Sequence, residues 1–198
     1  MQNSTSKVRV LTGTAMLGAV AAVLMYLEFP IPIMPAFVKL DVSELPALIA
    51  SFAYGPVSGI LVCLIKNLIK LPSTSTAAVG ELFNFVMGAL FVGVAGLIYK
   101  RNKTRKGAIV GALLGALVMA VVSVPYNYFI VYPAYVVMYH LPLDAIIGMY
   151  QAINPNVESL LACLLVFNLP FTFVKGALDA ALCFLVYKPL SPILHGRK

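Results

Sequence analysis

The stretch FNLPFTFVKGALD, residues 167–179, places a lysine, Lys175, inside a long apolar and aromatic segment. An ammonium group at the centre of a bilayer costs at least about 2.5–3.5 kcal/mol, so a lysine at membrane depth indicates a functional site. A structural ion pair with a neighbouring helix is the alternative explanation. Pro170 favours a functional role, because it leaves a backbone carbonyl unpaired one turn before Lys175, and such backbone is tolerated where it lines a cavity or packs within protein.

The composition of the whole chain agrees with a membrane location for this stretch. Hydrophobic residues make up 61% of the 198 residues and charged residues 11%, and the mean hydropathy is +0.96. Values of this kind are typical of an integral membrane protein and exclude an ordinary soluble core. We therefore expect an all-α integral membrane protein, a single domain of several helices embedded in a lipid bilayer.

The excess of basic residues is explained by where they lie. There are 14 Lys and Arg against seven Asp and Glu, which in a soluble protein would suggest nucleic acid as a partner. Basic residues are enriched in cytoplasmic segments of membrane proteins. The charge pattern therefore predicts no nucleic-acid partner and places both termini in the cytoplasm, together with a central basic segment; ten of the 14 are Lys7, Arg9, Lys100, Arg101, Lys103, Arg105, Lys106, Lys188, Arg197 and Lys198.

The same rule decides the number of spans. A single kinked helix through Gly55-Pro56 would carry the basic cluster of residues 100–106 outside, whereas two short helices that turn there keep it inside. Residues 131–155 are expected to form an external loop with interfacial helices, because a span there would place the basic C-terminus outside. Six transmembrane helices follow, at approximately residues 10–28, 43–54, 56–71, 80–99, 108–130 and 166–188.

Two segments near the N-terminus have alternative explanations. Ala15, Gly18, Ala19 and Ala22 form a stripe of small residues, which allows close helix contact either within this protein's own bundle or with a partner. Residues 29–41, FPIPIMPAFVKLD, contain three prolines and predict an extended apolar loop. This loop either covers a site or packs against the top of the bundle.

Polar residues beside Lys175 in the predicted topology suggest a binding site. Glu81 and Asn84 of GELFNF lie three residues apart, hence on one helix face, although Glu81 could simply stabilise the helix N-terminus. Asn127 follows Pro125, and Thr172 lies one turn before Lys175. We expect these groups on the outer side, where they would grip a flat small molecule with a polar edge between aromatic walls.

The chain has no sequence pattern of catalysis or metal binding. There is no nucleotide-binding loop, HExxH or GxSxG motif, and the three cysteines Cys63, Cys163 and Cys183 lie in apolar runs without ligand spacing. His140 and His195 are isolated and are expected to be solvated. The sequence therefore predicts neither an enzyme nor a protein with a metal or cofactor.

Several motifs together resemble the substrate-binding (S) components of energy-coupling factor vitamin transporters, and among them those specific for riboflavin. The resemblance extends over the full length, and its motifs are KLDVSELPALI, the Gly55-Pro56 turn, KNLIK, GELFNF and NLPFTFVKG. It implies six spans in the bacterial cytoplasmic membrane and riboflavin as the transported ligand. It also implies a transmembrane coupling subunit and two cytoplasmic ATPases as partners, with the S component toppling in the membrane when it docks.

The resemblance further implies roles for individual residues. Lys39 and Leu40 match the loop that gates the pocket, and Ala15 and Ala19 match the docking stripe of the first helix. Thr172 departs from the asparagine of the family pattern. Substrate contacts are implied at Glu81, Asn127, Asn168, Thr172 and Lys175.

The preferred hypothesis is a riboflavin-capturing S component. In it, Lys175 and Glu81 hold each other's charge or the polar edge of the ligand, which suits a neutral vitamin. A self-sufficient secondary transporter for another small nutrient is the alternative, although the chain is short and lacks an internal repeat. An intramembrane enzyme is a third possibility, for which the sequence offers no catalytic set.

Overall fold

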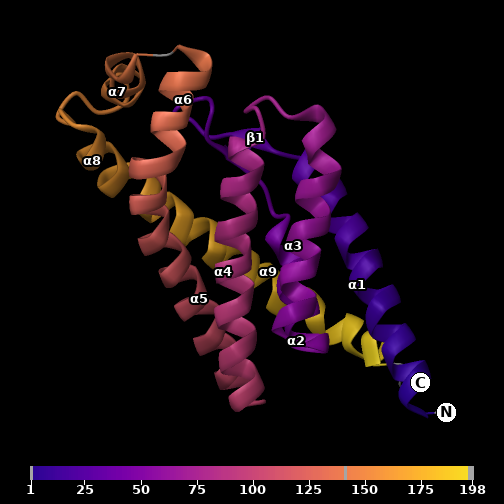
Figure 1. Ribbon diagram of the computed structural model, residues 1–198. Coiled ribbons are helices and arrows are strands. Elements are labelled where there is room, and N and C mark those ends of the chain that lie inside the picture. Colours follow the sequence, from indigo (N-terminus) through magenta and orange to yellow (C-terminus); the bar gives the residue numbers. More distant parts are fainter. Residues whose placement is uncertain (1, 141, 196–198) are drawn as a thin grey trace.

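The computed structural model describes residues 2–140 and 142–195, and the side chains of residues 7–140 and 142–187. Within these residues the regular secondary structure is helical apart from one pair of two-residue strands (Figure 1). Lys188, His195, Arg197 and Lys198 fall outside the described side chains. The elements are α1 (Gln2–Tyr26), β1 (Phe29–Pro30), β2 (Lys39–Leu40), α2 (Glu44–Tyr54), α3 (Pro56–Lys70), η1 (Leu71–Ser73), α4 (Val79–Arg101), α5 (Arg105–Tyr126), η2 (Asn127–Val131), α6 (Tyr132–Tyr139), α7 (Leu143–Gln151), α8 (Leu160–Cys163), η3 (Leu164–Asn168) and α9 (Leu169–His195).

Five helical segments of the described chain are long and apolar enough to cross a membrane. They are Lys7–Tyr26, Pro56–Ser73, Val79–Arg101, Arg105–Tyr139 and Leu160–Tyr187. The helix α2 has only 11 residues, about 16 Å at 1.5 Å per residue, so it is shorter than the hydrocarbon core of a bilayer. An all-α fold with several apolar helices is thus confirmed.

The predicted break at Gly55-Pro56 is present. Helix α2 ends at Tyr54, Gly55 has a φ of 108°, and Pro56 opens α3. A positive φ of this size favours glycine, and a proline is well tolerated at the first position of a helix, where no N–H is needed. The two helices then pack closely, since a Cβ on Gly59 would lie 2.7 Å from Ser51 Cβ.

The segment after residue 126 differs from the prediction. Residues 131–155 were expected to be a loop with interfacial helices, but the helix begun by α5 continues through the π-helical segment η2 and α6 to Tyr139. Pro125 and Pro133 flank η2, and a π-helical turn is one way in which a helix accommodates a disturbed hydrogen-bond ladder. Only the part from residue 140 onward, a short helix α7 between loops, agrees with the expected loop with short helices.

A similar irregularity precedes the stretch around Lys175. Helix α8 and the π-helical segment η3 lead into α9 without a break, and η3 ends at Asn168, two residues before Pro170. The helix therefore starts before the predicted boundary at residue 166. Helix α7 packs over this region, where Tyr132, Ile146, Tyr150 and Leu164 are almost fully buried in a small second core.

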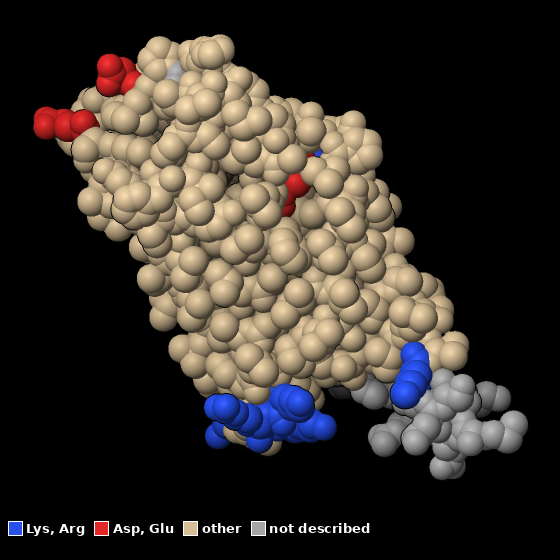
Figure 2. Space-filling view, in the orientation of Figure 1, with Lys and Arg blue, Asp and Glu red and all other residues tan. Residues whose placement is uncertain are grey.

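The two ends of the molecule differ in charge. Helix α1 begins and α9 ends toward the end that holds the α4–α5 connection, whereas the β1–β2 strands, α6 and α7 lie toward the opposite end (Figure 1). On the face shown in Figure 2, Lys and Arg gather at the first of these ends, and a broad uncharged belt lies between them and the acidic residues at the other. We call the first the basic end.

The small-residue stripe of α1 divides between two environments. Gly18 and Ala22 are buried, and a Cβ on Gly18 would lie 2.8 Å from Ile65 Cγ2 of α3, so this half packs within the bundle. Ala15 and Ala19 are exposed. Both explanations of the stripe therefore remain compatible with the fold, each for its own pair of residues.

Candidate functional site

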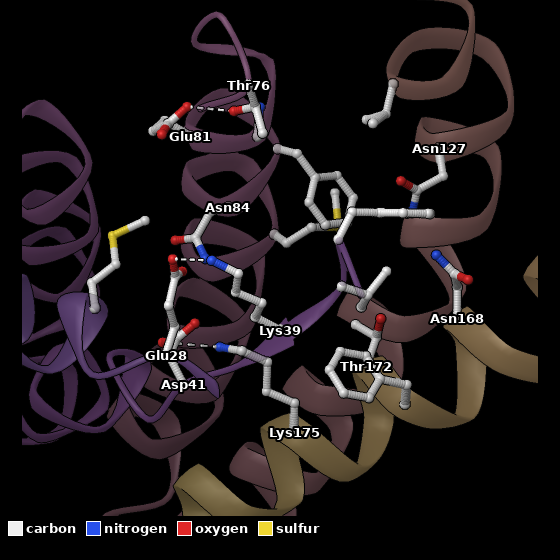
Figure 3. A pocket seen from close by; sticks show the side chains of 18 of the residues that line it. Glu28, Lys39, Asp41, Thr76, Glu81, Asn84, Asn127, Asn168, Thr172 and Lys175 are labelled. Carbon is white, nitrogen blue, oxygen red and sulfur yellow. Dashed lines mark hydrogen bonds and ion pairs between the residues drawn. The ribbon is translucent and has the colours of Figure 1, made fainter. Parts of the chain in front are cut away.

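A cavity of about 200 Å³ opens at the end opposite the basic end. Of the residues predicted to bind a substrate, Lys39, Glu81, Asn127, Asn168, Thr172 and Lys175 line it, whereas Leu40 does not. The polar groups come from the segment before α2 and from α4, η2, η3 and α9. Figure 3 shows Asn127 and Asn168 on one side, facing Glu28, Lys39 and Asp41 across the cavity.

Lys175 is held by acids and also borders the cavity. Its ammonium group donates to Glu44 Oε2 and lies 3.5 Å from Asp41 Oδ1 and 4.0 Å from Asp179 Oδ2 (Figure 3 shows the contact with Asp41). Because its side chain is only 11% exposed, these acids supply the compensation that a buried cation needs. Of the two roles expected for Lys175 and Glu81, a direct charge pair is wrong, since the ion-pair partners of Lys175 among the described residues are Asp41, Glu44 and Asp179. Contact of both residues with the polar edge of a ligand stays a prediction.

A second buried lysine, from α3, shares an acid with Lys175. Lys66 of α3 is fully buried, and its Nζ donates to Glu44 Oε1 at 2.7 Å and to Ser43 Oγ at 2.5 Å. One carboxylate, Glu44, therefore joins Lys66 and Lys175. We call Asp41, Glu44, Lys66, Lys175 and Asp179 the ion cluster.

Asp41 connects the ion cluster to the loop that precedes α2. Burial by itself raises the pKa of the Asp41 carboxyl, but Lys175, Lys66 and the hydrogen bonds from Ser43 lower that pKa to about 2. Asp41 Oδ1 accepts the backbone N–H of Ser43 at 2.8 Å. The carboxylate is thus ionised at neutral pH and joins the end of the loop to the floor of the cavity.

Glu81 is held by hydroxyl groups. Its Oε2 accepts from Thr74 Oγ1 at 2.8 Å and from Thr76 Oγ1 at 2.9 Å (Figure 3 shows the bond to Thr76). Glu81 lies in the first turn of α4 and is 6% exposed, so the threonines of the preceding loop stabilise its charge. On the same helix face, Asn84 accepts from Asn67 Nδ2 at 3.2 Å and also lines the cavity.

The two asparagines are fixed by different partners. Asn127 Nδ2 donates to Ser123 O at 2.8 Å, which leaves its Oδ1 available toward the cavity. Asn168 Oδ1 accepts from Tyr150 OH at 2.7 Å, and its Nδ2 donates to Tyr132 OH at 3.3 Å. The two phenol oxygens lie 2.5 Å apart, so the three groups form a closed ring. Burial raises the pKa of Tyr150 far above its usual range, and it stays a donor.

The loop before α2 covers one side of the cavity. Its ends pair as the antiparallel strands β1 and β2, with Phe29 opposite Leu40. Phe37 lines the cavity and meets the rings of Tyr132 and Tyr150 edge-on, at centroid distances of 6.3 and 6.2 Å. Leu40 thus supports the loop from within the strand pair.

A further acid ties this loop to the helices at the rim of the cavity. Glu28 Oε1 lies 2.9 Å from Lys39 Nζ and 3.4 Å from Lys70 Nζ. The Lys70 ammonium also lies 4.4 Å from the centre of the Tyr26 ring. These contacts join the loop to α1 and α3 on one side of the cavity, whereas Phe37 contacts Tyr132 and Tyr150 on the side of Asn168.

Sequence reasoning did not assign roles to Asp41, Glu44, Lys66, Tyr132 and Tyr150. The two acids were visible as charges three residues apart in the apolar run KLDVSELPALI, which is the signal that could have located partners for Lys175. The tyrosines gave no such signal, because tyrosines at headgroup level are common in membrane proteins. Among the described residues no group of His, Cys, Asp and Glu could hold a metal ion.

Comparison with known proteins places this arrangement in a family. Residues 9–187 match the ECF transporter, substrate-specific component. The chain is 33% identical to the riboflavin transporter RibU of Staphylococcus aureus over 91% of this chain and 89% of that protein. It is also 33% identical to the riboflavin transporter FmnP of Bacillus subtilis over 97% of each chain.

A solved structure gives the same result. The structure described as the S component of a bacterial ECF transporter superposes with a TM-score of 0.74, covers 98% of this chain and 99% of its own, and is 33% identical. The relatives are named as transporters, in agreement with a chain that lacks catalytic motifs. With a family match over nearly the whole chain and a fold to accompany it, this protein belongs to the substrate-specific (S) components of ECF transporters.

Proposed function

We propose that this protein is the riboflavin-binding S component of an ECF transporter, which captures the vitamin in the cavity beside Lys175. The observation that carries the proposal is the cavity itself, in which five predicted polar residues from three parts of the chain converge: Glu81, Asn127, Asn168, Thr172 and Lys175. The names of relatives at 33% identity support riboflavin as the ligand.

The groups in the cavity suit the chemistry of this vitamin. Riboflavin has a flat ring system with an edge that both donates and accepts hydrogen bonds, and a neutral chain of hydroxyls. Asn127 offers an acceptor oxygen, and Asn168 keeps one N–H beyond those used within its ring. Apolar and aromatic side chains such as Phe83, Met87 and Phe171 offer walls for the ring.

The charges around Lys175 fit a neutral ligand. Its ammonium group already faces carboxylates, so the cavity does not present an uncompensated cation that would demand an anion. Hydroxyl groups of the ligand can share the hydrogen bonds of the Lys175 ammonium and the Asp41 carboxylate. Lys175, and Glu81 on the other side, then act as ligand contacts.

The loop between α1 and α2 is proposed to gate the cavity. Phe37, Val38 and Lys39 line the cavity from this loop, and its attachment through Glu28 and Asp41 lies beside it. Opening requires the Glu28–Lys39 pair and the Phe37 contacts to separate. These contacts are few and partly exposed, as expected for an element that moves.

We further propose the wider arrangement of the family for this chain. It has six spans, with the short α2 as the second, both termini in the cytoplasm and the cavity facing outward in the bacterial cytoplasmic membrane. It delivers the vitamin by docking to a transmembrane coupling subunit that is driven by two ATPases. The exposed pair Ala15 and Ala19 on α1 is the proposed docking contact, because small residues allow a partner helix to approach closely.

A vitamin panel tests the ligand assignment. At a riboflavin concentration 100 times a sub-micromolar dissociation constant, linkage predicts a stabilisation of about 2.7 kcal/mol. For a chain of this size that corresponds to a rise in melting temperature of roughly 5–10 °C. Thiamine and biotin at the same concentration should produce no rise. A stabilisation by another vitamin, with none by riboflavin, would overturn the assignment.

A further inference from the structure

A second cavity, of about 310 Å³, lies at the basic end of the molecule, far from the substrate cavity along the bundle. Its walls are the turn between α2 and α3, residues 51–57, and the last residues of α4 with the connection that follows. Neither the ion cluster nor any residue of the first cavity takes part in it. The proposed function leaves this cavity without a role.

The lining of this second cavity combines two kinds of group. Lys100 and Lys103 bring positive charge, and neither forms an ion pair with a described residue. Phe52, Tyr99 and Val57 bring apolar and aromatic surface, and Val57 is 69% exposed. A phospholipid complements this combination, because its anionic headgroup can pair with the lysines and its acyl chains can lie on the exposed apolar surface.

The turn at Gly55 adds a polar and open boundary. Gly55 caps α3 without a side chain, so no side-chain oxygen occupies the positive end of that helix. A Cβ on Gly55 would meet nothing within 4 Å, which means that the space beside the turn is open. An anionic group in this space would meet the positive end of the helix dipole on one side and the lysines on the other. Because Pro56 has no N–H and the Ser58 N–H donates to Gly55 O at 3.0 Å, the lysines would be its main hydrogen-bond donors.

The position of the cavity indicates a lipid as the source of that anion. The basic residues gather at the boundary of the uncharged belt, where the headgroups of a bilayer lie (Figure 2). Tyr54 and Tyr99 also line the cavity, and tyrosine is enriched at this depth. Basic pockets between transmembrane helices are known sites for anionic headgroups.

We propose that the second cavity binds the headgroup of an anionic phospholipid through Lys100 and Lys103. The phosphate lies between the two ammonium groups and the start of α3, and the acyl chains run along the exposed apolar surface beside Val57. This inference does not depend on riboflavin as the substrate, because it uses none of the residues assigned to the first cavity.

The test measures lipid retention by native mass spectrometry. The full-length protein is exchanged into nanodiscs of phosphatidylcholine with a minor share of phosphatidylglycerol, and the lipid that remains on the released protein is counted. The wild type should retain phosphatidylglycerol in preference to phosphatidylcholine. Lys100→Gln/Lys103→Gln should lower this preference roughly 10- to 30-fold, as expected for about two surface charges in contact with an anionic lipid.

A matched variant separates a built site from diffuse charge. Arg105→Gln/Lys106→Gln removes the same charge from the start of α5, close in sequence to Lys103, but these residues do not line the cavity. This control should keep the wild-type preference. Equal losses in the two double variants, or none in either, would overturn the proposal. Riboflavin binding should be unchanged in both variants, which confirms that they are folded.

Two further arms complete the experiment. Val57→Glu keeps both lysines and places a negative charge at an exposed position of the lining, so it should also abolish the preference. Glycerol 3-phosphate and inorganic phosphate at millimolar concentration should not displace the lipid, because they lack acyl chains. Displacement by either would assign the site to a free phosphate compound and would overturn the lipid proposal.

Discussion

The ammonium group of Lys175 on α9 donates to the carboxylate of Glu44 on α2, and the other oxygen of that carboxylate accepts from Lys66 at 2.7 Å. Glu44 is therefore shared by two buried cations. It is also the first residue of α2, directly after the loop that covers the cavity. The relationship joins the floor of the site to the base of the loop.

Removing the charge of Glu44 should destabilise the whole protein. Glu44→Gln leaves Lys66 and Lys175 to share Asp41 and Asp179, and breaking a buried pair typically costs about 3–5 kcal/mol. The expected result is a large fall in melting temperature in detergent. The double variant Glu44→Gln/Lys66→Met restores the excess of one acid over the lysines that the wild-type ion cluster has, and it removes the lysine left without Glu44, so it should recover part of the loss. A Glu44→Gln protein as stable as the wild type would contradict this role.

Lys175→Met should weaken riboflavin binding without unfolding the protein. The loss of charged hydrogen bonds of about 1.5–3 kcal/mol predicts a dissociation constant roughly 10- to 100-fold higher. Glu44 keeps Lys66 as a partner, whereas Asp41 and Asp179 lose the cation that they face, so the melting temperature should fall while the protein stays folded. Titration with riboflavin measures the effect, and Lys106→Met is the control. Unchanged affinity would remove Lys175 from the site.

Tyr150→Phe should weaken binding through Asn168. Tyr150 does not line the cavity, but its hydroxyl donates to Asn168 Oδ1 at 2.7 Å and orients the amide. Loss of one hydrogen bond of about 1 kcal/mol predicts a roughly fivefold rise in the dissociation constant. Tyr128→Phe, at an exposed tyrosine, should leave binding unchanged. If both variants bind alike, the orientation of Asn168 does not depend on this ring.

The two halves of the α1 stripe should respond differently to larger side chains. Ala15→Leu/Ala19→Leu should keep riboflavin binding but abolish uptake by the assembled transporter, because both residues are exposed and proposed to contact the coupling subunit. Gly18→Leu should lower stability instead, since its Cβ would lie 2.8 Å from Ile65 Cγ2. Normal uptake by the double alanine variant would exclude this docking contact.

The sequence predicted the elements whose signals are local. The helix break at Gly55-Pro56 follows from the conformations that these two residues prefer, and composition alone indicated an all-α membrane protein. The extension of the helix to Tyr139 was missed because a span over residues 131–155 would place the basic C-terminus outside, so a loop was predicted there. Packing against α7 and the π-helical segment η2 decide otherwise, and neither is a property of the local sequence.

In the candidate site, too, the residues with a local sequence signal were predicted and those that depend on packing were not. Lys175 and Glu81 stand out as charges in apolar surroundings, and both line the cavity. Their partners could not be assigned, because Asp41 and Glu44 come from a segment more than 130 residues away from Lys175 in the chain. Which acid meets which lysine depends on how α2 and α9 pack. In this packing Lys175 pairs with Glu44, and Glu81 accepts hydrogen bonds from Thr74 and Thr76.

The most direct test of the central claim is an equilibrium titration of the purified wild-type protein with riboflavin, followed by the fluorescence of the flavin. The cavity beside Lys175 should take one riboflavin per chain with a sub-micromolar dissociation constant, and Lys175→Met should weaken this binding while the Lys106→Met control does not. Absence of saturable riboflavin binding by the folded wild-type protein would contradict the account.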